Sequence, residues 1–100
     1  LEVVLPGGAA ADEIIVVGAH YDSVATSPGA DDNASGVAAL LELARLLAGT
    51  TLPRTVRFVA FANEEAPFFY SDEMGSKLYA ARAQAQGKRI EAMLSLETVG

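Results

Sequence analysis

The sequence contains no cysteine and a single histidine, His20. The absence of cysteine excludes a disulfide framework, a thiolate zinc site and a cysteine nucleophile. Any catalytic triad or metal site that needs two histidines from these residues is excluded as well. The chemistry of a site must therefore come from carboxylates, hydroxyls and one imidazole.

Basic residues are also few: seven Lys and Arg stand against thirteen Asp and Glu, which gives a net charge of −6. The excess lies in the first half, because residues 1–50 carry seven acids and one base, whereas residues 51–100 carry six of each. An acidic balance argues against a nucleic-acid partner, whose phosphates are neutralised by Lys and Arg.

Long apolar runs are missing too. The longest stretches, such as Ile14–Ala19, are far too short to span a bilayer, and no signal peptide opens the chain. The chain lacks a starting methionine, begins in a strand-like run and ends just after another, so we expect residues 1–100 to be one incomplete domain. The compartment stays unknown, although the absence of free thiols fits export to the periplasm or medium.

The pattern of apolar residues predicts an α/β fold. About half of the residues are hydrophobic (51%), which is enough to bury a core. The expected elements, in chain order, are strands at 1–5 and 14–19, a helix near 37–47, a strand at 56–61, a helix at 75–86 and a strand at 92–96. Strand–helix–strand order predicts parallel pairing with right-handed crossovers. We expect a mostly parallel sheet of about four strands, with the first strand pairing antiparallel to the second.

The first helix has clear start and stop signals. Apolar residues recur at helical spacing from Val37 to Leu47 and form one face. The polar residues Asp31–Asn33 precede this face and are expected to cap the helix, and Gly49 follows it as a stop.

Acidic residues gather at one edge of the predicted sheet, because ligands in open parallel sheets bind beyond the carboxyl ends of the strands. One histidine and six carboxylates follow the strands or precede the first helix: His20, Asp22, Asp31, Asp32, Glu64, Glu65 and Glu97. Six carboxylates in one crevice repel each other unless a cation lies between them. Imidazole with carboxylates and no thiolate suits zinc, manganese, iron or cobalt. The edge is therefore a candidate metal site.

Each of these residues also has an ordinary structural interpretation when it is taken alone. His20 could simply end a strand, and Glu64 and Glu65 could be a solvated pair. The coincidence of four segments at one edge favours the metal site. Asp22, two residues after His20, is close enough to orient the imidazole. A serine hydrolase with His20 as its base lacks the Gly-x-Ser-x-Gly elbow and leaves the carboxylates unexplained.

Five stretches resemble the zinc peptidases of family M28, which are co-catalytic metallo-aminopeptidases and their relatives. The stretches are Gly18–Ser23, Gly29–Gly36, Phe61–Glu65, Met74–Ser76 and Leu94–Glu97. They follow in the family's order, and the similarity runs from about residue 14 to residue 100. The resemblance implies a three-layer α/β/α fold of the phosphorylase/hydrolase-like type, of which this chain is the N-terminal portion.

The resemblance also implies roles for individual residues at the first zinc. His20 and Glu97 resemble ligands of this ion, and Asp32 resembles the aspartate that bridges both zinc ions. Asp22 resembles the carboxylate that orients the histidine ligand. The first-zinc set is complete in these residues.

At the second zinc, Glu65 resembles a ligand and Glu64 resembles the general base. The family supplies a further histidine for this ion from much later in its chain, and these 100 residues contain none. The resemblance therefore implies two zinc ions per complete site, with one set of ligands fully encoded here. It also implies that the isolated chain is inactive.

The implied function is metal-dependent hydrolysis of peptide bonds, with release of N-terminal amino acids from a peptide that has a free N-terminus. Two alternatives stay open. One is a non-catalytic metal-binding or interaction fragment, and the other is an acyltransferase like the glutaminyl cyclases, which share the fold and use one zinc. An exposed sheet edge would also allow self-association.

The aromatic residues Phe68–Tyr70, which follow Pro67, are expected to pack onto the sheet. The alternative is that they line a substrate pocket.

Overall fold

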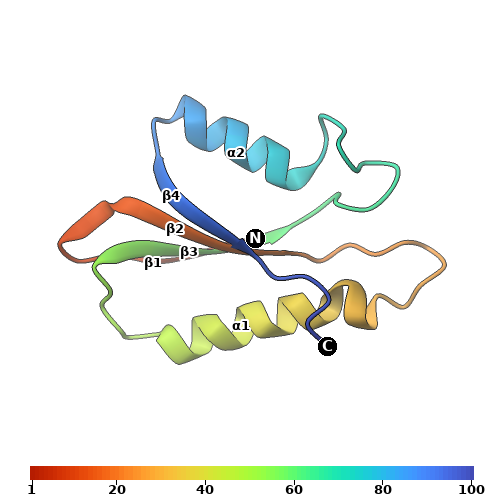
Figure 1. Cartoon of the computed structure of the whole chain (residues 1–100), viewed down its shortest axis with the longest axis horizontal. Helices are drawn as coiled ribbons and strands as arrows, with labels where there is room; N and C mark the ends of the chain where they lie inside the picture. Colours follow the sequence, from red (N-terminus) through yellow and green to blue (C-terminus); the bar gives the residue numbers. More distant parts are fainter.

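The β-branched run near the start of the chain forms the central strand of a four-stranded sheet in the computed structural model, which describes residues 1–100 (Figure 1). The strands are β1 (Glu2–Leu5), β2 (Ala10–His20), β3 (Arg54–Phe61) and β4 (Arg89–Ser95), and the helices are α1 (Gly36–Leu47) and α2 (Gly75–Ala85), with a π-helical turn, η1 (Ala30–Ser35), directly before α1. The predicted α/β class is confirmed.

The strand order in the sheet is β1-β3-β2-β4. β2 runs parallel to β3, from Ile14 opposite Thr55 to His20 opposite Phe61, and it runs parallel to β4 on its other side. β1 pairs antiparallel with β3. The antiparallel edge is thus confirmed, but the predicted partner of the first strand is wrong. Both sides of β2 are taken by parallel crossover partners, and β1 pairs instead with the free side of β3.

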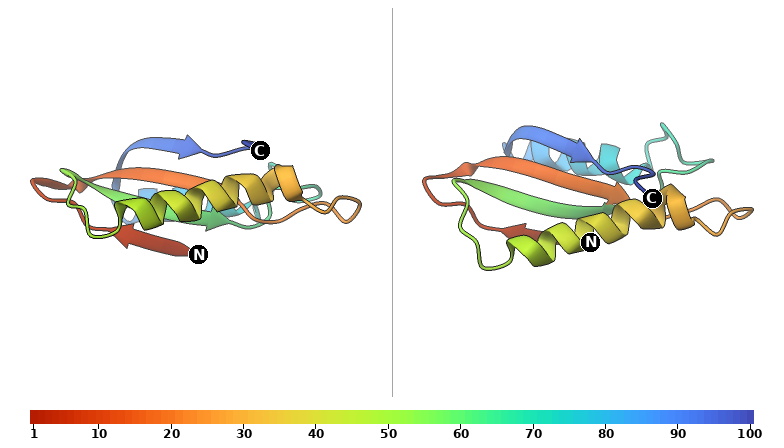
Figure 2. Two further views of the ribbon diagram at one scale, coloured as in Figure 1. Left: turned by 90° about the horizontal axis from the view of Figure 1, so that it is seen from below. Right: turned by 60° about the horizontal axis from the view of Figure 1, so that its bottom comes forward.

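Side chains of β2 and β3 alternate between the two faces of the sheet, as the strand period requires. On one face, Leu40 of α1 packs with Val17, Ala19, Val56 and Phe58. On the other face, Ile14, Val16, Val59 and Phe61 form a second cluster against Tyr79 of α2. Figure 1 shows α1 and α2 on opposite sides of the sheet, and Figure 2 shows α1 lying along the strands. The result is three layers with an apolar core on each side of the sheet.

The start of α1 differs from the prediction. Asp31 and Asp32 lie in η1, and α1 begins only at Gly36, with no side-chain hydrogen bond at its N-cap residue. Asn33 Oδ1 accepts the N–H of Gly36, so only this member of the predicted cap contacts the start of the helix. The end of α1 agrees with the prediction, because Gly49 follows it with a positive φ of 77°.

Three strands are longer at their amino ends than the sequence pattern indicates. β2 begins at Ala10, β3 at Arg54 and β4 at Arg89. All seven residues of β4 are exposed, because one side of this strand has no neighbour in the sheet. No helix in the structure has the length and apolar character that crossing a membrane requires.

Candidate metal centre

The carboxyl ends of β2, β3 and β4 meet at the same end of the sheet, next to η1 (Figure 1). His20 is the last residue of β2, and Glu64 and Glu65 follow the end of β3. Glu97 follows the end of β4, and Asp32 lies in η1. Parallel pairing therefore brings together side chains that lie up to 77 residues apart in the sequence.

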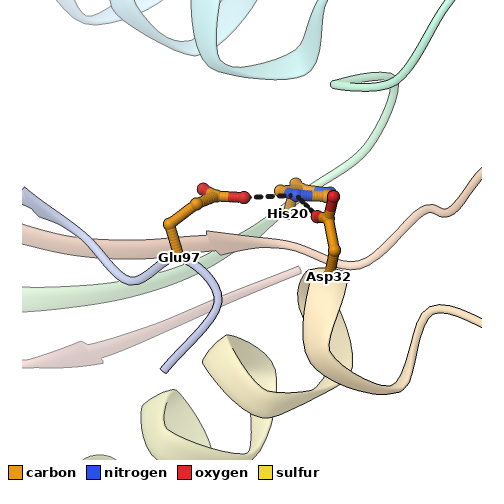
Figure 3. Close-up of side chains that lie close together, drawn as sticks. All are labelled: His20, Asp32 and Glu97. Carbon is orange, nitrogen blue, oxygen red and sulfur yellow. Dashed lines mark hydrogen bonds and ion pairs between the residues drawn. The ribbon is translucent and has the colours of Figure 1, made fainter. Parts of the chain in front are cut away.

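His20 is the buried centre of this group, with 3% of its surface exposed. Its Nδ1 lies 3.2 Å from the backbone carbonyl of Asp22, so the Nδ1–H donates a hydrogen bond there. Nε2 then points at the carboxylates, 2.7 Å from Oε1 of Glu97 and 3.0 Å from Oδ1 of Asp32 (Figure 3). The hydrogen bond at Nδ1 orients the ring so that Nε2 is the nitrogen available to a metal.

The pKa of His20 reflects these neighbours. Burial lowers this pKa, but the hydrogen bond to Glu97 and the negative charges of Glu97 and Glu64 raise it, and the net pKa lies above its usual value. The charged imidazole is thus stabilised by the carboxylates around Nε2. The same oxygens and the same Nε2 are the donor atoms that a divalent cation would use.

Asp22 connects the two neighbouring strands β2 and β3 beyond their carboxyl ends. Its carboxylate accepts the backbone N–H of Glu64 at 3.2 Å and that of Glu65 at 3.0 Å. The same carboxylate lies 3.4 Å from Nδ1 of His20. Asp22 therefore orients the imidazole through its backbone carbonyl, and its side chain holds the backbone that carries the two glutamates.

The pKa values of Asp22 and Glu64 move in opposite directions. Burial raises the pKa of Asp22, but the hydrogen bonds from the backbone N–H groups of Glu65 and Glu64 outweigh burial and lower it. Burial is also the largest cause of the raised pKa of Glu64; His20 opposes it, and the nearby carboxylates add to it. Asp22 is thus held in its charged form, whereas Glu64 is the carboxylate with the greater tendency to take up a proton.

Two overlapping sets of side chains place one donor atom each within 4.8 Å of one another. The first set is His20, Asp32 and Glu97, and the second is His20, Glu64 and Glu65. No Lys or Arg forms an ion pair with any of these carboxylates. One imidazole with several uncompensated carboxylates is a donor set that fits zinc and similar divalent metals.

Asp31, like Asp22, is a carboxylate of the predicted group that lies outside both sets. It accepts the N–H of Gly100 at 3.0 Å and the hydroxyl of Ser35. Its neighbour Asn33 was not expected to take part, yet it is 1% exposed and bonded to the segment after β4. No local pattern could have indicated this, because its partners lie more than 60 residues away.

In the aromatic loop after β3, Phe68 is partly buried, but Phe69 and Tyr70 are exposed, so the predicted packing onto the sheet is wrong for these two residues. Phe69 and Tyr70 contact each other with ring centroids 4.2 Å apart, and 49% and 79% of their surfaces are exposed. The ring that contacts Phe61 of the sheet edge-to-face is instead Tyr79 of α2. Phe69 instead borders an open pocket of about 310 Å³, together with Glu64, Glu65 and Ala66.

Residues 2–100 match the sequence model of peptidase family M28. The chain is 49% identical over 107 residues to uncharacterized protein YfbL of Escherichia coli K12, a match that covers 98% of this chain and 32% of that protein. It is 40% identical over 89 residues to aminopeptidase YwaD of Bacillus subtilis 168, covering 88% of this chain and 18% of that one.

Among solved structures, an aminopeptidase from Aneurinibacillus sp. strain AM-1 superposes with a TM-score of 0.81 at 38% identity. The match covers 99% of this chain and 24% of the aminopeptidase. The chain therefore spans about a third or less of the length of the proteins that it resembles.

Proposed function

The chain belongs to peptidase family M28, and we propose that residues 1–100 form the first part of the catalytic domain of a zinc-dependent aminopeptidase. The observation that carries this proposal is the buried imidazole of His20, whose Nε2 lies 2.7 Å from Glu97 and 3.0 Å from Asp32. Two similar proteins are named as aminopeptidases, which supports the exopeptidase class.

His20, Asp32 and Glu97, whose donor atoms lie close together, are the proposed ligands of a first zinc ion. Asp32 and Glu65 are the proposed ligands of a second zinc ion. The fit rests on their chemistry: one nitrogen and several oxygens, close together, without a neighbouring cation. When bound, zinc would supply Lewis-acid polarisation of the scissile carbonyl and would lower the pKa of water.

Glu64 is the proposed general base. It takes a proton from the attacking water and passes it to the leaving amine. Its backbone N–H is bonded to the carboxylate of Asp22, which holds its position beside the metal ligands. The free carboxylates at this end of the sheet would also attract the positively charged α-amino group of a peptide substrate.

The chain on its own is proposed to bind one zinc ion and to lack peptidase activity. His20 is the only histidine, and both sets of donors use it. The second set therefore has no histidine of its own. The remaining ligand and the pocket walls would come from further residues, as in relatives that are three or more times longer.

A zinc titration of the metal-stripped chain by calorimetry tests the metal centre, with His20→Ala as the control variant. Binding of about one zinc by the wild-type chain and none by the variant is expected, since His20 is shared by both sets. Equal binding by the two proteins would show that His20 is not a ligand. Absence of binding by the wild-type chain would refute a metal centre formed by these residues.

Hydrolysis separates the aminopeptidase from the two alternatives. In a protein that contains the complete catalytic domain, aminoacyl anilides should be cleaved, and peptides with an N-terminal glutamine should not be cyclised. Cyclisation without cleavage would favour the glutaminyl-cyclase class. Tight zinc binding with neither reaction would favour a non-catalytic metal-binding protein.

Self-association through β4 is a further part of the proposal. The outer side of this strand has no partner, and Met93 and Leu94 are about half exposed. Unpaired strand edges with apolar side chains readily pair with another chain. A monomeric elution volume in size-exclusion chromatography at high protein concentration would contradict it.

A further inference from the structure

Asn33 is the most deeply buried polar residue of the structure, with 1% of its surface exposed against 3% for His20. It makes three hydrogen bonds. Nδ2 donates to the carbonyl of Leu96 at 2.8 Å, and Oδ1 accepts the N–H of Gly36 at 3.2 Å and the N–H of Thr98 at 3.1 Å. The nitrogen and the oxygen of this amide are thus both hydrogen-bonded to the protein and shielded from solvent.

The partners of Asn33 place it between two of the proposed metal ligands. Leu96 and Thr98 are the residues on either side of Glu97, and Asp32 directly precedes Asn33 in the chain. One side chain therefore connects the backbone of η1, which carries Asp32, to both flanks of Glu97. These two segments have no other buried polar connection among the hydrogen bonds of the structure.

The contacts of Asn33 match an amide and no other side chain. An aspartate would accept both N–H groups but could not donate to Leu96, and an apolar residue would leave all three groups without a partner. The space beside the Asn33 amide also restricts which residue can stand at position 36. A Cβ at Gly36 would lie 2.4 Å from Oδ1 of Asn33 and 2.4 Å from the carbonyl of Leu96, so glycine is required beside the amide.

Glu97 lies just beyond the last bond between β4 and the sheet, in which the N–H of Leu96 donates to the carbonyl of Gly18 at 2.8 Å. Every residue of β4 is exposed, and this strand is bonded to the sheet on one side only. Glu97 and Asp32 both carry negative charge and both approach Nε2 of His20. Their mutual repulsion would drive the two segments apart in the absence of a cation. The bonds of Asn33 oppose that separation in a buried setting, where hydrogen bonds are strongest.

We propose that Asn33 is a positioning residue that holds Glu97 opposite Asp32 and thereby sets the affinity of the centre for a divalent metal. This inference rests on the metal centre proposed above. Asn33 itself contacts neither His20 nor the oxygens of the ligands. It acts through the backbone on either side of Glu97.

Calorimetric zinc titration of the Asn33→Ala variant tests the proposal. We expect a loss of about 10- to 100-fold in zinc affinity, the range found when residues that orient metal ligands are removed. Thr55→Val is the matched control. Thr55 is also buried and links Gly7 and Ala11 through its hydroxyl, but it lies at the opposite end of the sheet. This control should lose stability and keep the wild-type zinc affinity.

A double-mutant cycle separates positioning from general destabilisation. If Asn33 acts through Glu97, then Asn33→Ala should lower zinc affinity much less in a Glu97→Gln background than in the wild-type chain. Equal losses in the two backgrounds would overturn the proposal. So would an Asn33→Ala variant that binds zinc as tightly as the wild type, or a Thr55→Val control that loses as much affinity as Asn33→Ala.

Amide hydrogen exchange on the wild-type chain gives a test that needs no variant to fold. By linkage, if the bonds of Asn33 favour metal binding, then zinc must favour those bonds. The amides of Gly36 and Thr98 should become more protected when zinc is added, and the amide of Gly7, which donates to Thr55, should not. Zinc binding without added protection of the Gly36 and Thr98 amides would overturn the proposed role of Asn33 but would leave the metal centre unaffected. Failure to bind zinc would overturn the metal centre and this inference with it.

Discussion

Acidic residues at the two ends of the sheet differ in whether they form ion pairs with Lys or Arg. At the amino end of the parallel strands, Arg54 lies 2.7 Å from Glu13, and Arg89 lies 3.1 Å from Asp12 and 3.3 Å from Glu13. At the carboxyl end, four carboxylates lie within 4 Å of His20, and none of them has a Lys or Arg partner. One end is neutralised within the chain, and the other is left with excess negative charge.

The two ends therefore differ in how their negative charge is balanced. Ion pairs at the amino end need no external partner. Carboxylates at the carboxyl end repel one another, and a single imidazole cannot neutralise them. A cation bound at this end would relieve the repulsion, which is the property expected of the proposed metal centre.

The largest expected effect comes from Glu64→Gln in a protein with the complete catalytic domain. Removing a general base typically lowers turnover by about 10²- to 10⁴-fold. The amide keeps the size of the side chain, and Glu64 is not among the proposed zinc ligands, so zinc content measured by elemental analysis should stay unchanged. Near wild-type turnover would show that Glu64 is not the base. Loss of zinc together with turnover would show that Glu64 is a ligand.

Metal removal is the second way to test whether the uncompensated negative charge at the carboxyl end of the sheet needs a bound cation. Chelation should lower the thermal midpoint of unfolding, because it restores the repulsion at the carboxyl end. At a zinc concentration one hundred times the dissociation constant, the bound ion adds about 2.7 kcal/mol to the free energy of unfolding. Differential scanning calorimetry with and without zinc measures this change. Identical midpoints would mean that the carboxylates are not held together by the ion.

The smallest effect is expected at the amino end. Arg89→Gln breaks ion pairs with three acids, but all of these groups lie near the surface, where such pairs contribute little and are screened by salt. The thermal midpoint should fall only slightly, and the fall should vanish at high salt. Zinc affinity, measured by calorimetry, should not change. A marked loss of zinc affinity would contradict the independence of the two ends.

Much of the candidate site could be predicted from local pattern. The β-branched run before Gly18 indicates a strand buried on both faces, and a buried strand of this kind pairs in parallel through crossovers. The residues after each such strand must then meet at one edge. His20, Glu64 and Glu97 could be placed together on this basis, and the structure brings them within reach of one another.

Other features depend on contacts that no local pattern contains. Asp31–Asn33 have the composition of a helix cap, yet Asn33 is bonded to residues more than 60 positions later. Asp22 could be placed near His20, but its bonds to the backbone of Glu64 and Glu65 depend on how the ends of β2 and β3 lie. A short polar side chain has many partners available, and only the assembled fold selects among them.

The sequence by itself determined the strand and helix types, the parallel direction of β2, β3 and β4, and the edge at which the acidic residues collect. These follow from side-chain periodicity and chain connectivity, which are local or nearly local properties. Tertiary structure alone decided that β1 pairs with β3, that Asn33 joins η1 to the segment after β4, and that Nε2 of His20 faces Asp32 and Glu97. Such choices depend on which hydrogen-bonding groups are still unpaired once the sheet has formed, and burial makes each unpaired group costly.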